Sequence, residues 1–311
     1  MVRKLIKRTK KTKDLKSKEI PELEEFRFFI LANIIKVKNI VMQKHRINGI
    51  IYKKKLRECI NIYWGAIFMT TSMLKIIACL LMLIDHMGAA LFPEATILRM
   101  IGRLSFPVFA YLIAVGYSKT NSFSKYLRRL LIFAVISQIP FSLAFGEQIS
   151  IHSFSDFLSF FAGSPYPHLN IFFTLALGLL AIRTWDKEES RPGKIIGVLA
   201  LGITAEVFHT DYSMYGIAMI LAFYIFRDNK IKTVISQTTV YIIFNALQIL
   251  LYALNSPGVS ISLAWFNQAL SLLALIFIFM YNGKKGKNLK YFFYAFYPVH
   301  LLVIGLIKLF M

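Results

Sequence analysis

The chain has 311 residues, of which 57% are hydrophobic and 17% are charged, and its formal net charge is +21. Soluble domains carry about 25% charged residues and no long uncharged apolar runs. Here apolar runs of about 18 to 22 residues recur from Met73 onward, the length that a helix needs to cross about 30 Å of hydrocarbon. The composition therefore excludes a soluble globular protein and predicts an all-α, polytopic transmembrane helical bundle.

Residues 1–72 form a basic segment that holds 18 of the 37 Lys and Arg residues. No uncharged hydrophobic core lies near its start, so it does not resemble a secretory signal. Three interpretations stay open: a solvated cytoplasmic tail against anionic lipid headgroups, a nucleic-acid-binding arm, and an extension upstream of a natural start near Met73. The lack of a folded recognition motif disfavours nucleic acid as a partner. We therefore divide the chain into this basic tail and a transmembrane domain, residues 73–311.

Nine apolar segments of the second domain are predicted to be transmembrane helices. In chain order they are 74–92, 97–117, 128–145, 169–184, 195–208, 212–226, 233–252, 261–281 and 290–310. The fifth and sixth are short, so we expect them to be tilted, broken or joined near the surface.

The charges of the loops predict the orientation of these segments. Fifteen Lys and Arg residues occupy alternate loops, and the intervening loops contain none. The basic positions are Lys119, Lys125, Arg128, Arg129, Arg183, Lys187, Arg191, Lys194, Arg227, Lys230, Lys232, Lys284, Lys285, Lys287 and Lys290. Because Lys and Arg are retained on the cytoplasmic side, the pattern predicts nine spans with the N-terminus inside, in the plasma (inner) membrane. The lipid bilayer is thus the first predicted partner.

Ionisable side chains inside the predicted spans indicate an internal site. A charge at the bilayer centre costs about 2.5–3.5 kcal/mol on insertion scales, so it faces the bundle interior and needs a partner. Asp85 and His86 follow Lys75 by 10 and 11 residues, which places them about 15–17 Å deep. Arg103 lies about 9–12 Å below the outer surface, and His300 lies about 15 Å along the last span. We expect these groups from three helices to meet at one depth.

The pairing of these charges follows from helical geometry. Asp85 and His86 are adjacent and point about 100° apart, so they cannot pair with each other. Asp85 is expected to neutralise Arg103 or Arg99, which share a helical face, and this leaves His86 free for chemistry. A purely structural ion pair and a proton or ion relay in a transporter are the alternatives, and His300 alone is also typical of an interhelical hydrogen bond.

A second group of polar residues lies at the predicted outer face. His168 and Asn170 begin the fourth span, and Asp211 and Tyr212 lie in the turn before the sixth. Together they suggest the rim of a cavity. The two cysteines, Cys59 and Cys79, have no zinc-ligand spacing, so no metal site is predicted.

Five segments in the second domain resemble a known family. They are Leu74–Gly88 with its Asp85-His86 pair, Ile101–Leu112 with a Gly-Arg-x-x-Phe-Pro motif, Tyr126–Phe141, Leu169–Phe172 and Tyr294–Leu301. In this order they resemble the TraX family of conjugative-transfer membrane proteins, over about residues 73 to 311. The chain has Asp211-Tyr212-Ser213 where that family usually has Asp-Tyr-Gly, and a glycine there would permit a tight turn.

The resemblance implies acetyl transfer. An enzyme of this kind would move an acetyl group from cytoplasmic acetyl-CoA to an extracytoplasmic acceptor, such as the amino terminus of pilin, a glycan or a peptide. His86 is then the general base or a transient acyl carrier, Asp85 and Arg103 position the site, and His300 assists. Arg103 would stabilise the oxyanion or hold a donor phosphate. The residues expected to bind the substrates are Arg99, Lys125, Arg128, Arg129, His168, Asn170, Asp211 and Tyr212.

A transporter or assembly factor for an exported peptide or pilus subunit is the alternative function. It predicts related halves, whereas we see no internal repeat in the sequence. An acetyltransferase instead predicts an opening lined by basic residues that runs from the cytoplasm to His86.

Overall fold

The computed structural model describes residues 69–146, 168–255 and 263–311, and this part of the chain is almost entirely helical. Its helices are α4 (Thr71–Ala90), α5 (Thr96–Gly102), α6 (Ser105–Lys119), α7 (Phe123–Phe145), α9 (Ile171–Lys187), α10 (Arg191–Val207), α11 (Ser213–Phe226), α12 (Lys230–Asn255), the 3₁₀ helix η1 (Leu263–Leu273), α13 (Ala274–Phe279) and α14 (Lys290–Phe310). The predicted basic tail, up to residue 68, lies outside the described residues.

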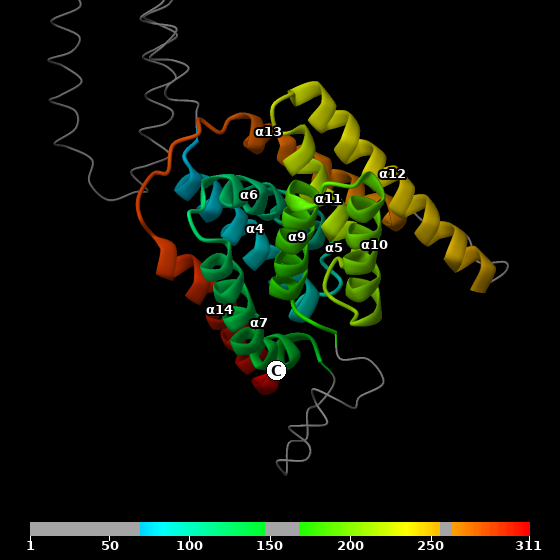
Figure 1. Ribbon diagram of the computed structural model, residues 1–311. Helices are drawn as coiled ribbons and strands as arrows, with labels where there is room; N and C mark the ends of the chain where they lie inside the picture. The colour runs from blue at the N-terminus through cyan, green and yellow to red at the C-terminus, as the bar shows by residue number, and fades with distance from the viewer. Residues whose placement is uncertain (1–68, 147–167, 256–262) are drawn as a thin grey trace, which may run out of the picture. The chain divides into compact units, whose positions relative to one another are not determined.

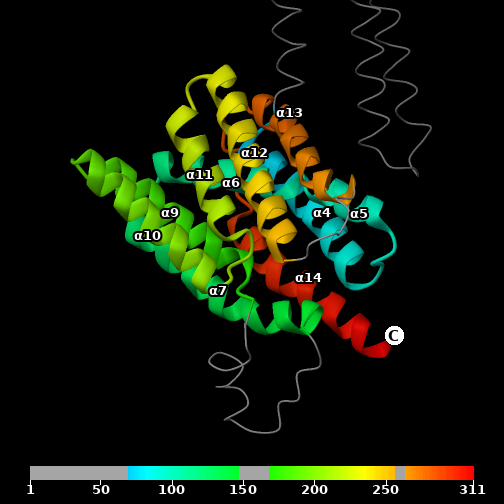
Figure 2. The same cartoon turned by 90° about the vertical axis from the view of Figure 1, so that its right-hand side faces the viewer.

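The helices pack around α4, which contacts α5, α6, α7 and α14 (Figures 1 and 2). On one side α14 packs along α7, and on the other α9, α10 and α11 pack against one another. One continuous core of buried apolar side chains joins these layers, with Leu74, Phe223 and Leu301 among its fully buried members.

Each of the nine predicted segments is helical where it is described, but the helices differ in length. Five stretches of the described residues are long and apolar enough to cross a membrane: Thr71–Ala90, Thr96–Lys119, Phe123–Phe145, Lys230–Asn255 and Tyr291–Phe310. Helices α9 and α10 have 17 residues each, which is about 25 Å at 1.5 Å per residue and short of about 30 Å of hydrocarbon. The nine-span count and the cytoplasmic N-terminus therefore stay predictions.

The second predicted span is interrupted, which the sequence analysis did not expect. Helix α5 ends at Gly102, and α6 begins at Ser105. Pro107 has no N–H to donate to the carbonyl of Arg103, so one hydrogen bond of a continuous helix is missing at this point. Gly102 lies directly against Asp85 of α4, where a Cβ atom would come within 2.2 Å of the Asp85 Cβ. The break and this close contact fix how α5 meets α4.

The four basic loops lie at one end of the bundle. Lys119, at the end of α6, donates to the carbonyl of Gly283 over 2.6 Å. Arg183 at the end of α9 lies 4.3 Å from the ring centroid of Phe123, and Lys230 lies 5.5 Å from that of Phe279. The structure thus brings together the loops that the charge pattern assigned to the same side of the membrane.

Large apolar side chains are exposed along the outward faces of α10, α12 and α14. They include Ile195, Ile196, Leu199, Ile203, Ile235, Ile242, Ile243, Leu250, Val299, Val303 and Leu306. A soluble monomer rarely exposes contiguous apolar surface of this extent, whereas lipid tails cover it without cost.

Candidate functional site

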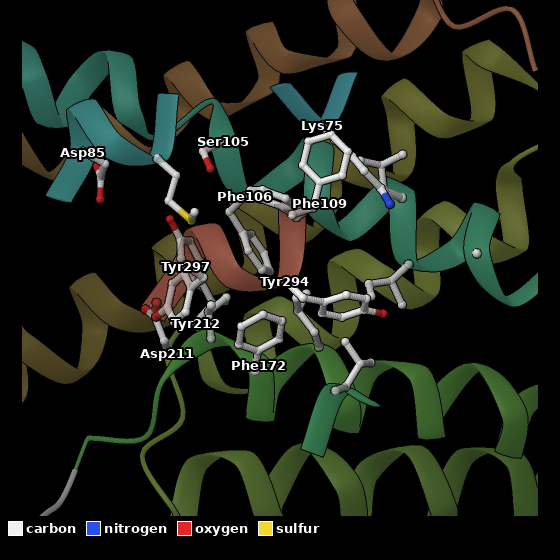
Figure 3. A pocket seen from close by; sticks show the side chains of 18 of the residues that line it. Lys75, Asp85, Ser105, Phe106, Phe109, Phe172, Asp211, Tyr212, Tyr294 and Tyr297 are labelled. Carbon is white, nitrogen blue, oxygen red and sulfur yellow. The ribbon is translucent and has the colours of Figure 1, made fainter. Parts of the chain in front are cut away.

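A cavity of about 690 Å³ lies between α4, α6, α7, α9 and α14. Figure 3 shows its middle section, where the aromatic side chains of Phe106, Phe109, Phe172 and Tyr294 separate Lys75 from the polar groups around Asp211. The cavity therefore has two chemically different ends, joined by an aromatic passage.

The first end carries positive charge. Its cationic lining residues are Lys75, Lys119, Arg129, Lys285 and Lys287. They come from the start of α4, the end of α6, the first turns of α7 and the segment before α14, all of which belong to the basic end of the bundle. An anionic group that enters the cavity from this end would meet several cations at once.

The second end carries the ionisable groups that the sequence predicted to converge. Its lining residues are Asp85, His86, Arg99, Arg103, His168, Asp211 and Tyr212. They are contributed by α4, α5, the α5–α6 break, and the segments that precede α9 and α11. The predicted convergence of Asp85, His86 and Arg103 is thus found in the structure.

Asp85 pairs with Arg99 rather than Arg103, which answers the alternative left open by the sequence. Arg99 Nη1 lies 2.5 Å from Asp85 Oδ2 and 3.3 Å from the Asp85 carbonyl oxygen. The other carboxylate oxygen of Asp85 is buried and has no hydrogen-bond partner among the described residues. Arg99 is therefore the main group that compensates the burial of this charge.

Arg103 occupies the interruption between α5 and α6 and contacts a different partner. Its Nη1 donates to the Tyr212 hydroxyl over 3.4 Å. The Tyr212 ring is stacked on Phe106, with ring centroids 3.9 Å apart. Arg103 forms no salt bridge among the described residues, but its charge interacts with the nearby carboxylates of Asp85 and Asp211.

His86 and His300 form a direct hydrogen bond. His86 Nδ1 lies 2.7 Å from His300 Nε2, and His300 Nδ1 lies 2.7 Å from the carbonyl oxygen of Phe296. Both rings are buried, but only His86 lines the cavity. His300 lies behind His86 and reaches the site through it.

Asp211 lies in a strained turn between α10 and α11. His209, Tyr212 and Ser213 have φ angles of 44°, 63° and 41°, so three non-glycine residues here adopt left-handed conformations. Ser213 thus adopts the left-handed backbone conformation that a glycine would favour. The Asp211 backbone is held by Leu169, whose carbonyl accepts from its N–H over 2.8 Å, and by the Thr174 hydroxyl, which donates to its carbonyl.

The carboxylate of Asp211 makes no side-chain hydrogen bond within the part of the chain that the structure describes. Burial raises the pKa of this carboxyl above its ordinary value, and the nearby His168 and Arg103 oppose that rise. His168 itself is tied to the turn, since its Nδ1 lies 2.6 Å from the His209 carbonyl oxygen. Both side chains line the second end of the cavity, together with Arg99 and Arg103.

Three residues predicted to bind substrate are placed elsewhere. Asn170 is fully buried, caps α9 and hydrogen-bonds Ala134 and Gln138 of α7 over 2.7 and 2.8 Å, so it joins two helices. Lys125 and Arg128 are exposed on α7 and do not line the cavity. Of the three α7 cations, Arg129 alone lines it.

Several lining residues were missed by the sequence analysis, notably Lys75, Lys119, Lys285 and Lys287. A signal for Lys75 was present, because positions 75, 82 and 86 share one helical face. The two lysines before α14 gave no such signal, since their segment is not helical.

A chain whose described residues are almost entirely helical, with apolar outer faces, candidate spans and a charged internal cavity, is a multi-pass membrane protein.

Comparison with known proteins gives its family. The family model described as TraX protein matches residues 70–308, so the chain belongs to the TraX family. It is 33% identical to the "Probable fimbrial assembly protein FimC, serogroup H1" of Dichelobacter nodosus over 249 residues, which cover 76% of this chain and 95% of that protein. It is 25% identical to the "Protein TraX" of Escherichia coli (strain K12) over 147 residues, 47% of this chain and 52% of that one. No solved structure matches the chain.

Proposed function

We propose that this protein is a membrane-embedded acetyltransferase that takes an acetyl group from cytoplasmic acetyl-CoA and transfers it to an extracytoplasmic acceptor. The observation that carries the proposal is the single cavity that joins a cation-lined end to His86. A thioester donor with a polyanionic head needs both features in one continuous space.

The donor's dimensions fit the basic half of the cavity. Lys75 and His86 lie on one helix, eleven residues apart, which corresponds to about 16 Å. A long, thin arm can cross this distance through the aromatic passage while its phosphates stay with the cations. Arginine and lysine are the usual phosphate partners, and Arg129 adds a planar guanidinium to four lysines.

The chemistry is a nucleophilic acyl transfer. An amine or hydroxyl of the acceptor gives its proton to His86 as it attacks the thioester carbonyl, and the charge on the carbonyl oxygen is stabilised by Arg103. The C–S bond then breaks, and His86 returns the proton to the thiolate of coenzyme A. If His86 is instead an acyl carrier, the acetyl group passes first to its ring nitrogen and then to the acceptor.

The acceptor approaches from the other end of the cavity, past His168 and Asp211. These residues lie in the segments just before α9 and α11, far along the bundle from the basic loops. The Dichelobacter nodosus relative is named a fimbrial assembly protein, which favours a pilus subunit as acceptor. An exported glycan or peptide is the alternative acceptor.

The test is acetyl transfer by purified protein from acetyl-CoA carrying a labelled acetyl group. We expect transfer by the wild type and a loss of at least about 100-fold in His86→Ala, because a general base contributes about 10²–10⁴-fold. Cys79→Ala is the matched control, since Cys79 is buried on the same helix but does not line the cavity. Label retained without acceptor by the wild type but not by His86→Ala would identify His86 as a carrier, and equal transfer by wild type and His86→Ala would overturn the assignment.

The same cavity favours a second function, because its lining extends from the basic loops to His168 and Asp211. A non-enzymatic transporter or assembly factor would use such a passage for an exported peptide or pilus subunit. It would transfer no label from acetyl-CoA under any condition.

A further inference from the structure

A chain of two hydrogen bonds connects His86 to the backbone of α14. The Phe296 carbonyl oxygen is 2.7 Å from His300 Nδ1, and His300 Nε2 is 2.7 Å from His86 Nδ1. Both nitrogens of His300 are therefore used, whereas His86 Nε2 has no hydrogen-bond partner among the described residues. His86 Nε2 is the nitrogen left for the cavity.

The rings meet edge to edge. Their planes differ by 11° and their centroids are 5.0 Å apart, nearly twice the distance between the two bonded nitrogens. Rings stacked face to face could not bring two atoms to 2.7 Å, because non-bonded ring atoms stay about 3.5 Å apart. The lone pair of one nitrogen thus points along the ring plane at the N–H of the other, which is the geometry of a strong hydrogen bond.

The direction of the chain follows from its fixed end. A carbonyl oxygen only accepts, so His300 Nδ1 carries a proton. In a neutral ring the other nitrogen, Nε2, is then bare and accepts. The proton between the two rings consequently belongs to His86 Nδ1, and His86 Nε2 carries a lone pair.

We infer that His300 is a positioning residue that fixes His86 in the Nδ1–H tautomer, so that Nε2 is the atom that takes the acceptor's proton. The inference rests on the proposed function only in this last step. His300 Nε2 accepts the hydrogen bond of His86 Nδ1 and so sets the tautomer of His86, as carboxylates and carbonyls do for other functional histidines. The edge of Phe145, with its ring centroid 5.2 Å away, helps to hold the His86 ring in place.

The direct test is the ¹⁵N nuclear magnetic resonance spectrum of histidine-labelled full-length protein in lipid nanodiscs, without any substrate. Protonated and bare ring nitrogens resonate far apart, and His86→Gln identifies the His86 signals by their loss. We expect wild-type His86 to be protonated at Nδ1 and bare at Nε2. A His86 that is protonated at Nε2, or an imidazolium on either ring, would overturn the inference.

Two variants separate positioning from packing. Gln at position 300 still offers an oxygen near the place of Nε2, whereas Leu offers none. We expect His300→Gln to keep the Nδ1–H tautomer of His86, and His300→Leu to lose it. An unchanged tautomer in a folded His300→Leu would refute the role.

The enzymatic readout is separate from the spectrum. Removing the group that orients a metal-bound histidine costs about 10–100-fold, and we expect a similar factor for a histidine that acts as a base. We expect kcat of His300→Leu to fall by that factor with KM for acetyl-CoA unchanged, and His300→Gln to recover most of it. If the wild type transfers no acetyl group but shows the expected tautomer, the proposed function fails and the positioning inference stands. If transfer occurs with the opposite tautomer, only the inference fails.

Discussion

The ion pair between Asp85 and Arg99 makes a quantitative prediction about stability. The Asp85 side chain is 12% exposed and that of Arg99 is 32% exposed. Losing the partner should therefore destabilise the protein more when Asp85 remains than when Arg99 remains. Arg99→Gln leaves a carboxylate that is nearly buried, and one of its oxygens has no other partner within the described residues. Breaking a buried pair in this way costs about 3–5 kcal/mol, which we reduce to about 2–3 kcal/mol because Arg99 is partly solvated.

The reverse substitution should cost less. In Asp85→Asn, Arg99 can turn toward water, and we expect a loss of about 1 kcal/mol. The double variant should resemble Asp85→Asn, because the stranded carboxylate is gone. The coupling between the two sites is then about 2–3 kcal/mol, well above the error of additivity for independent sites.

The assay is unfolding by sodium dodecyl sulfate in mixed micelles, followed by the loss of helical circular dichroism. Lys187→Gln is the matched control, because Lys187 pairs with Asp186 at 3.1 Å but is 67% exposed. Its effect should stay within about 0.5 kcal/mol of the wild type. Equal destabilisation by Arg99→Gln and Asp85→Asn, or an Arg99→Gln effect no larger than the control's, would refute the reasoning.

Three further predictions concern the cavity and its orientation. The double substitution Lys119→Gln and Lys287→Gln should raise KM for acetyl-CoA by about 5–30-fold, at about 0.5–1 kcal/mol per partly solvated cation. The control Lys232→Gln, which is exposed outside the cavity, should leave KM unchanged. An equal KM in the two variants would exclude the basic end as the donor site. Burial raises the pKa of Asp211 in the folded protein, so the stability that this carboxyl contributes is complete below its ordinary pKa of 3.8 and is lost as the pH rises through the folded pKa. Asp211→Asn should therefore be more stable than the wild type at neutral pH and weaker in acceptor use. A less stable Asp211→Asn at pH 7 would contradict the sign of that shift. A reporter fused after Gly258 should be extracytoplasmic and one after Gly286 cytoplasmic, and the opposite result would invert the predicted topology.

The helical segments were predictable because hydropathy alone marks them. Every predicted segment is helical where described, and the alternation of basic and uncharged loops correctly grouped the basic ones at one end. Span length was predictable as well, because the predicted segments 169–184, 195–208 and 212–226 have 16, 14 and 15 residues and helices α9, α10 and α11 have 17, 17 and 14. Hydropathy could not decide whether such short helices cross the bilayer.

The site was predictable as a meeting of residues but not as a set of pairs. Arg99 and Arg103 share a face of an ideal helix, so spacing could not choose between them as partners of Asp85. The choice follows from the interruption after Gly102, which leaves Arg99 on α5 beside Asp85 and places Arg103 near Tyr212. Pro107 carried the signal for that interruption. Asn170 also carried an unused signal, because Asn before an apolar helix is typical of an N-cap.

Two prolines release backbone carbonyls of residues that line the cavity. Pro107 deprives the Arg103 carbonyl of its helical donor, and Pro298 of α14 does the same for Tyr294. In hydrocarbon a freed carbonyl is tolerated only where protein or a water-filled space satisfies it, and both Arg103 and Tyr294 line the cavity. Both freed carbonyls thus belong to residues that line the cavity. Only Pro107 lies beside an interruption, because α14 runs unbroken through Pro298 and α7 runs unbroken through Pro140. A proline alone therefore does not interrupt these helices, and in the second span it coincides with the close contact between Gly102 and Asp85.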